Sequence, residues 1–139
     1  MLVSKNNIHT VIPQGDPMIM IDNLIDRDED NSRTDYLIKT NNVFINGNVL
    51  QESGLIENLA QTAAAGIGYR SMNSGENHFA LFIGAISKLV ISRLPYAGEL
   101  LNSHARVLHR TFNASVIEGI IHCNEEVIAK CEMKLFVRK

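Results

Sequence analysis

The sequence predicts an α+β protein in which a curled antiparallel sheet wraps around one long, buried helix. Three observations favour this fold class. One helical run, residues 53–69, is made almost entirely of apolar and small residues, and about six further segments have the composition of strands. Four of those strands follow one another at the C-terminal end and are joined by short turns. Runs of strands with one segregated helix are typical of α+β folds with an antiparallel sheet.

The expected helix, SGLIENLAQTAAAGIGY, repeats apolar residues at the i, i+3, i+4 spacing of a helix. Its second half is mostly Ala and Gly, so other elements must pack against it at short range from several sides. Glu57 and Gln61 are polar exceptions, and a spacing of four residues puts them on one face. Burying a carboxylate is costly unless it is paired, which makes Glu57 a candidate catalytic residue. A first-turn glutamate also suits the helix dipole, so a structural role stays open.

The segments expected to form strands are 18–26, 35–40, 78–93, 99–110, 112–123 and 127–137. Residues 71–77 are expected to form the loop that ends the helix, and the polar run 26–35 a solvated hairpin or strand edge. Gly84 is a candidate bulge, and Asn124-Glu125 a hairpin turn. In the last strand, the side chains expected to face the core are Val127, Ala129, Cys131, Met133, Leu135 and Val137. A sheet curled around one small-residue helix is the hot-dog architecture, expected here as one domain over residues 1–139.

The composition, 45% hydrophobic and 20% charged, is that of a globular protein, with no apolar run long enough to span a membrane. Residues 1–11 lack the pattern of a secretory signal, so we expect a cytoplasmic protein. A net charge of −2 with scattered basic residues argues against binding to nucleic acid. Cys123 and Cys131 lack metal-ligand spacing and are expected to be reduced core thiols. We expect no metal and no cofactor.

Three stretches of the sequence, in this order, resemble a known family. They are IPQGDPMIMID (12–22), LIENLAQ (55–61) and FIGAISKLVISRLPYAGELL (82–101). Together they resemble the motifs of the 3-hydroxyacyl-acyl-carrier-protein dehydratases, from about Ile8 to Val137. The pattern is most similar to the divergent dehydratase-like proteins of aryl polyene and flexirubin pigment pathways. The resemblance implies fatty-acid or polyene-type biosynthesis, a substrate carried as an acyl thioester on acyl carrier protein or CoA, and a dimer.

The loop before the helix departs from that family. Ordinary members carry a Gly-His-Phe-Pro-Gly loop there, and its His is the catalytic base. This chain has INGNVLQESG at 45–54, and no His occurs between His9 and His78. The nearest counterparts are Asn42 and Asn48. An amide side chain can orient a substrate but cannot accept a proton, so the base is missing from this loop.

The remaining site residues follow from the chemistry of dehydration. Backbone N–H groups at the start of the helix, around Gly54, could stabilise the thioester oxygen. Glu57 could donate a proton to the departing hydroxyl, with Gln61 beside it. His78 opens the strand after the helix and could lie near the mouth of a substrate tunnel. We therefore expect Glu57 to be catalytic, and substrate-binding roles for the residues Gln61, Asn42, Asn48, Gly54 and His78.

Three interpretations of the function remain open. The first is a dehydratase subunit, because in the resembled family each active site combines His from one chain with Glu from the other. A His-bearing hot-dog partner could then complete a site on Glu57. The second is a thioesterase that uses Glu57 and a water molecule. The third is a non-catalytic subunit that binds acyl thioesters. The first is favoured, and a homodimer is the alternative assembly.

Overall fold

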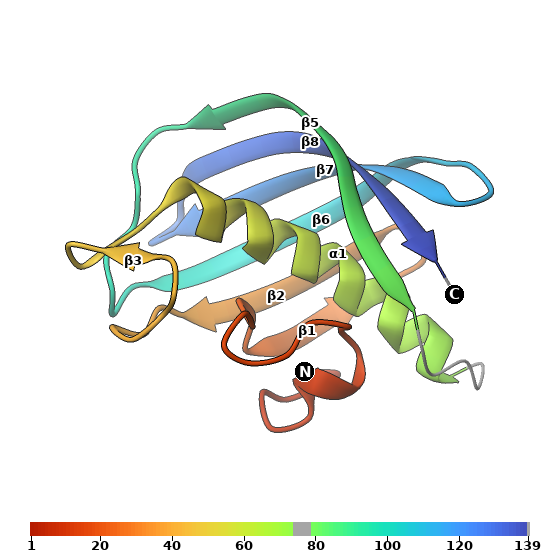
Figure 1. The fold of residues 1–139 in the computed structure, drawn as a ribbon, viewed down its shortest axis with the longest axis horizontal. Helices are drawn as coiled ribbons and strands as arrows, with labels where there is room; N and C mark the ends of the chain where they lie inside the picture. The colour runs from red at the N-terminus through yellow and green to blue at the C-terminus, as the bar shows by residue number, and fades with distance from the viewer. Residues whose placement is uncertain (74–78, 139) are drawn as a thin grey trace.

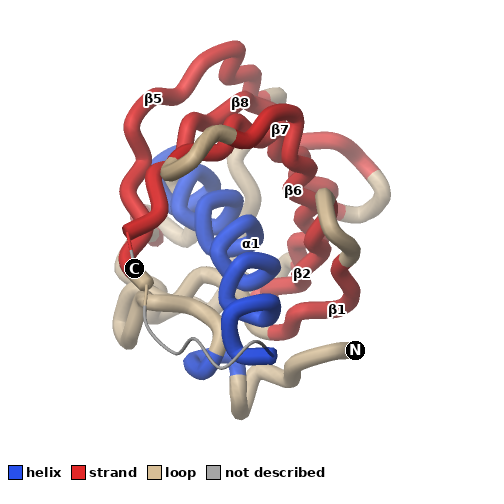
Figure 2. The backbone as a smooth tube through the Cα atoms, turned by 90° about the vertical axis from the view of Figure 1, so that its right-hand side faces the viewer, coloured by secondary structure: helices blue, strands red, loops and turns tan. Residues whose placement is uncertain are grey.

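The computed structural model describes residues 1–73 and 79–138, and it shows a six-stranded antiparallel sheet curled around one long helix (Figure 1). The strand order is β1-β2-β6-β7-β8-β5. Figure 2 shows the strands curving over one side of α1. The predicted hot-dog fold is confirmed. The elements are η1 (Ile8–Thr10), β1 (Asn23–Arg27), β2 (Asn31–Leu37), β3 (Ile45–Asn46), β4 (Val49–Leu50), α1 (Glu52–Asn73), β5 (Ala80–Ile91), β6 (Leu100–Arg110), β7 (Ala114–Cys123) and β8 (Glu126–Arg138).

Small residues let α1 lie close to its neighbours on opposite sides. A Cβ atom at Gly119 of β7 would lie 2.8 Å from Cδ1 of Leu59, so the sheet approaches the helix closely there. On another side, a Cβ at Gly68 would lie 1.7 Å from the carbonyl oxygen of Val11 in the N-terminal segment. Ala64 is fully buried in the cluster that this segment forms with the helix. The expectation that the helix is packed from several sides is therefore confirmed. No helix in the described part of the chain is long and apolar enough to cross a membrane.

The first expected strand begins later than predicted, because residues 18–22 are not a strand and β1 begins at Asn23. Helix side chains satisfy the backbone there instead. The N–H of Met20 donates to Oε1 of Gln61 at 2.7 Å, and its carbonyl accepts from Nδ2 of Asn58 at 2.8 Å. The helix also continues to Asn73, past its expected end, so residues 71–73 of the expected loop are helical. The rest of that loop lies outside the described residues.

The C-terminal hairpin matches the prediction at its turn but not at the start of its last strand. Asn124 and Glu125 both have positive φ, 53° and 66°, as a tight two-residue hairpin turn requires. Alternate residues of β8 are buried from 129 to 135, as expected. However, Val127 is 46% exposed while Ile128 is buried, because the pairing of β7 and β8 shifts register between 121 and 122. One extra residue in a strand moves the following side chains to the other face.

Gly84 lies at a bulge, as predicted, where the register of β5 against β8 shifts. A Cβ atom at this position would lie 2.3 Å from the ring of Phe136, so the glycine makes room for the aromatic side chain. The predicted polar hairpin is also present, as the turn between β1 and β2. These local features follow from turn residues and alternation, which depend on neighbours in the sequence.

Glu99 fixes the loop between β5 and β6, which in turn holds the segment before the helix. Its carboxylate accepts a bidentate pair of hydrogen bonds from Arg93, at 3.0 and 3.2 Å, and one from the N–H of Tyr96 at 2.8 Å. In the same loop, the N–H of Ala97 donates a hydrogen bond to the carbonyl of Asn48. The hydrogen bonds from Arg93, followed by that from Tyr96, lower the pKa of Glu99 to about 2. The folded protein therefore favours the ionised form.

We expect the contribution of Glu99 to stability to disappear in acid. Because the pKa of Glu99 is lower in the folded state than its ordinary value of 4.5, the contribution is fully present above that value. It is lost as the pH falls towards about 2. The measurement is the free energy of urea unfolding for the wild type and Glu99→Gln at several pH values. The difference between the two proteins should shrink steadily below pH 5 or so, and a difference independent of pH would contradict the assignment.

Candidate functional site

Glu57 and Gln61 lie on one face of α1, as their spacing predicts. Nε2 of Gln61 donates to Oε1 of Glu57 at 3.0 Å and to the carbonyl of Met18 at 2.7 Å, while its Oε1 accepts the N–H of Met20. Gln61 is fully buried, and its amide oxygen and nitrogen are both engaged within the chain. In this structure it orients Glu57 and fastens the segment 18–20 to the helix.

Glu57 is half-buried and has one hydrogen-bond partner, Gln61, among the residues that the structure describes. No Lys, Arg or His of that part of the chain forms an ion pair with it. One of its carboxylate oxygens therefore remains available to a group from outside the chain. A carboxylate that is positioned by its own helix but otherwise unengaged can act in acid–base chemistry.

Asn58 is a second polar residue of this helix, and sequence reasoning missed its role. Its Nδ2 donates to the carbonyl of Met20, and its Oδ1 accepts from Oγ of Ser103 on β6 at 2.6 Å. Asn58 is fully buried and thereby links the sheet, the helix and the segment 18–20. The signal was a polar residue next to Glu57 in an otherwise apolar run. A buried amide needs hydrogen-bond partners, so such a position marks a long-range contact.

Asn42 lies near the same segment. Its Nδ2 donates to Oη of Tyr36 at 2.7 Å and to Sδ of Met20 at 2.9 Å, and its Oδ1 accepts the N–H of Phe44. Met20 thus connects Asn42 to the residue Gln61. Asn42 also lines a hollow of about 630 Å³, which Glu57 does not line. Hydrogen bonds through Met20 and Gln61 therefore connect Asn42 to Glu57, while the amide group of Asn42 holds the conformation of its own loop.

Asn48 and Gly54 occupy the hairpin and the helix start, as the sequence suggests. Asn48 has φ of 65° in the tight turn between β3 and β4, and its side chain is exposed. The N–H of Gly54 donates to the carbonyl of Gln51 at 2.9 Å, so it is engaged in the first turn of the helix. A Cβ atom at Gly54 would lie 2.8 Å from Cδ1 of Leu50. The glycine lets the hairpin pack directly against the helix start.

None of the histidines that the structure describes forms a hydrogen bond with Glu57. His78 lies outside the described residues. Nε2 of His104 shares a hydrogen bond with Oδ1 of Asn31 at 2.7 Å, and burial lowers the pKa of this imidazole. None of the hydrogen bonds formed within the described ranges joins Glu57 to the other histidines, His9, His109 and His122. Over those ranges no cluster of three or more His, Cys, Asp or Glu side chains could hold a metal ion.

Comparisons with known proteins agree with this fold. The model of the ApeP-like family, described as ApeP dehydratase, matches residues 6–139. The 3-hydroxyacyl-[acyl-carrier-protein] dehydratase FabZ of Pseudothermotoga lettingae is 23% identical, and the alignment covers 96% of both chains.

Solved structures share the fold at lower identity. One is the dehydratase heterocomplex ApeI:P from Xenorhabdus doucetiae, with a TM-score of 0.89 and 15% identity over 95% of this chain and 91% of that chain. Another is a hypothetical thioesterase with coenzyme A from Streptococcus pneumoniae, with a TM-score of 0.63 and 11% identity over 83% and 84% of the two chains. The family match spans nearly the whole sequence, including the helix that carries Glu57. The chain belongs to the ApeP-like family of dehydratase-like hot-dog proteins.

Proposed function

We propose that this chain is one subunit of a heterodimeric 3-hydroxyacyl thioester dehydratase. It contributes Glu57, and a His-bearing hot-dog partner contributes the base. The observation that carries the proposal is that Glu57 has a hydrogen bond from Gln61 but no partner for its second carboxylate oxygen among the described residues. The segment before the helix, residues 45–50, is a tight hairpin without a titratable side chain. A base for the reaction must therefore come from outside this segment.

The reaction removes a proton from the carbon next to the thioester carbonyl and expels the hydroxyl group from the following carbon as water. A carbon–carbon double bond forms as the C–H and C–O bonds break. In the proposed site, the partner's imidazole accepts the proton from carbon, and Glu57 in its protonated form gives a proton to the leaving hydroxyl. Gln61 holds the carboxyl group in position through its hydrogen bond. The substrate is the acyl thioester of an acyl carrier protein or of CoA.

The two edges of the sheet differ, which supports assembly through β5. Strand β1 is covered by the N-terminal segment, where Val3 pairs with Leu24. Strand β5 is the opposite edge of the sheet (Figure 1), and most of its side chains are exposed. The large apolar side chains exposed on β5 are Phe82, Ile83, Ile86 and Val90. A long apolar edge strand is unfavourable in isolation, so we propose that β5 pairs with an edge strand of a second hot-dog chain. The similar heterocomplex ApeI:P supports a partner of another sequence.

A charge on this edge should disrupt the assembly. Ile86 lies in the middle of β5 and is 39% exposed, so Ile86→Lys would bury a lysine in the proposed interface. We expect the dissociation constant to rise about tenfold or more, seen by light scattering as a shift towards the 15.5 kDa monomer. Leu100→Lys is the control, since Leu100 is 43% exposed on the interior strand β6. A wild-type chain that remains monomeric at micromolar concentration, alone and with the partner, would overturn the pairing.

Reconstitution tests the proposed activity. The chain alone should convert 3-hydroxyacyl thioesters to enoyl thioesters very slowly, measured by the ultraviolet absorbance of the product. The purified heterodimer should be active. Strong dehydration by the chain alone would contradict the missing base. Release of free thiol, lost in Glu57→Gln, would instead identify a thioesterase, and binding of the acyl carrier without turnover in any mixture would identify a non-catalytic subunit.

A further inference from the structure

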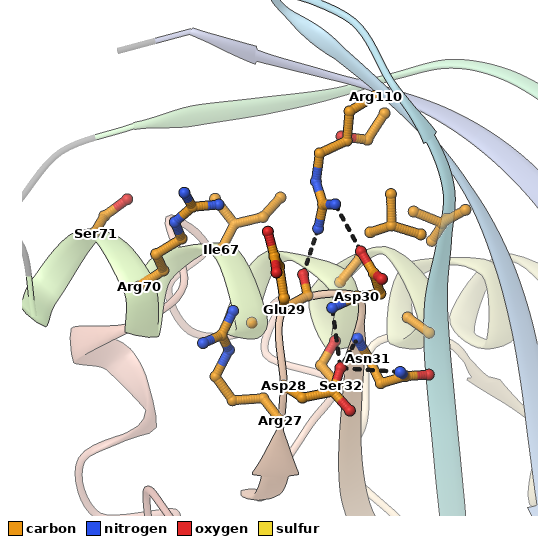
Figure 3. A pocket seen from close by; sticks show the side chains of 16 residues that line it. Arg27, Asp28, Glu29, Asp30, Asn31, Ser32, Ile67, Arg70, Ser71 and Arg110 are labelled. Carbon is orange, nitrogen blue, oxygen red and sulfur yellow. Dashed lines mark hydrogen bonds and ion pairs between the residues drawn. The ribbon is translucent and has the colours of Figure 1, made fainter.

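A cavity of about 440 Å³ lies between the C-terminal half of α1 and the sheet (Figure 3), and Glu57 is not among the residues that line it. Its inner wall consists of small and apolar residues of the helix and of strands β6 and β7. These are Ala63, Gly66, Ile67, Ala105, Val107 and Ile117. The rest of the lining is polar or charged and comes from three arginines, the turn between β1 and β2, and the serines Ser32, Ser71 and Ser115. The cavity thus combines an apolar wall with a charged side, and ligand pockets commonly pair apolar walls with polar groups that orient the ligand.

Helix geometry separates this cavity from Glu57. Arg70 follows Glu57 by thirteen residues, which is roughly 20 Å along the helix axis. Gly66 follows Glu57 by nine residues, and at about 100° per residue it lies on nearly the opposite face. The cavity and the site on Glu57 thus lie on different faces of the helix, and the cavity lies further towards its C-terminal end. A ligand in the cavity does not occupy the site on Glu57.

The turn that lines the cavity is fixed by its own hydrogen bonds. Arg110 donates to Oδ1 of Asp30 at 2.7 Å and to the carbonyl of Glu29, as the dashed lines in Figure 3 show. The carboxylate of Asp28 accepts from the side chain of Asn31 at 2.9 Å and from backbone N–H groups of Asp30 and Asn31. These hydrogen bonds, chiefly that from the Asn31 side chain, lower the pKa of Asp28. The charges of Arg110, Asp30 and Asp28 are therefore engaged within the turn.

Arg27 and Arg70 differ from Arg110 in their interactions. Neither forms an ion pair with any residue in the described ranges. Arg27 lies over the ring of Tyr69, with Cζ 6.0 Å from the ring centroid. Its Nε is buried and has no hydrogen-bond acceptor there, which is unusual for a charged donor. Figure 3 shows both side chains on the side of the cavity beside Ile67. Asp28 and Glu29 are the carboxylates of the turn that form no ion pair in the described ranges, and the charge of Asp28 is already stabilised by its hydrogen bonds within the turn.

We propose that this cavity binds a small amphipathic anion. A carboxylate or phosphate group is held by Arg27 and Arg70, and a short aliphatic or aromatic tail packs against the apolar wall. Guanidinium groups bind such planar or tetrahedral oxyanions through charge-assisted hydrogen bonds. Asp28 and Glu29 weaken binding because their negative charges repel the ligand.

Calorimetric titration of the full chain with octanoate, octyl phosphate, octan-1-ol and acetate tests the proposal. Octanoate or octyl phosphate should bind, and the tighter of the two identifies the preferred head group. Octan-1-ol lacks the charge and acetate lacks the tail, so each should bind about tenfold more weakly or worse. Octan-1-ol that binds as tightly as both anions, or no binding of either anion, would overturn the proposal.

Single substitutions then test where the ligand binds. Arg70→Gln should weaken octanoate binding about tenfold or more, and because Arg70 is exposed the variant should fold normally. Arg27→Gln should do the same, and Glu29→Gln should strengthen binding. Arg106→Gln is the control, because Arg106 is an exposed arginine of β6 that pairs with Glu118 and does not line the cavity. Equal losses in Arg106→Gln and Arg70→Gln would contradict a specific site. Loss in Glu57→Gln would place the ligand at the other site and also overturn the proposal.

Discussion

Replacing Glu57 by Gln in the heterodimer should lower the rate of dehydration by about 10²–10⁴-fold, the usual contribution of one general acid or base. The amide is similar in shape and can still accept the hydrogen bond from Gln61, but it cannot deliver a proton to the leaving hydroxyl. The maximal rate should fall, while the Michaelis constant should change little because substrate contacts are kept. The measurement is the steady-state rate of enoyl thioester formation by heterodimer purified through tags on both chains.

Glu52→Gln is the matched control for this experiment. Glu52 lies in the first turn of the same helix, and its side chain is exposed. Its replacement should leave the rate within about twofold of the wild type, since the helix keeps its shape and surface charges contribute little. Both variants should unfold at the same urea concentration as the wild type. Normal activity in Glu57→Gln would remove Glu57 from the catalytic role and leave a binding role for this chain.

Gly68→Ala should destabilise the folded chain by about 3 kcal/mol, at the upper end of overpacking effects. A Cβ atom there would lie 1.7 Å from the carbonyl oxygen of Val11 and 2.6 Å from its carbonyl carbon, so the backbone of one segment must move. Alanine is the better helix former by about 1 kcal/mol, and this gain offsets only part of the strain. The measurement is the free energy of unfolding in urea, followed by circular dichroism.

Gly15→Ala is the control for the glycine experiment, because nothing lies within 4 Å of a Cβ atom at Gly15. It should change the free energy of unfolding by less than about 1 kcal/mol. A Gly68→Ala protein as stable as the wild type would show that the N-terminal segment does not pack on the helix. That packing matters for the site, because the same segment continues to Met20, which contacts both Gln61 and Asn58.

The features predictable from the sequence are those that depend on neighbouring residues. The periodicity of residues 53–69 locates the helix, and its Ala and Gly content predicts close packing from several sides, as Gly66 and Gly68 show. The spacing of Glu57 and Gln61 predicts that they share a face, where they form a hydrogen bond. The hairpin turn at 124–125 follows from residues that tolerate positive φ. The hot-dog fold follows from these elements together.

The errors concern contacts between distant parts of the chain. The apolar run at 18–21 resembles a strand, but the N–H of Met20 bonds a side chain 41 residues away, on the helix. Ile128 is buried and Val127 is exposed because the register of β8 against β7 shifts at this point. The sequence of β8 alone does not encode that shift. The role of Asn58 likewise depends on Ser103 and Met20, which lie far from it in the sequence. Local pattern carries no information about which distant group satisfies a buried polar atom.

The asymmetry of the heterodimer tests the central claim most directly. In the proposed heterodimer, we expect the partner's imidazole to meet Glu57 in one site and the partner's own helix carboxylate to face the amides of Asn42 or Asn48 in the other. Only the first site should therefore work. The measurement is the dehydration rate of heterodimer in which the glutamate of the partner's helix is replaced by glutamine, compared with heterodimer that carries Glu57→Gln. We predict that the first keeps the rate of the wild-type heterodimer and the second loses it by about 10²–10⁴-fold. The reverse result, activity lost with the partner's substitution and kept in Glu57→Gln, would contradict the composite site.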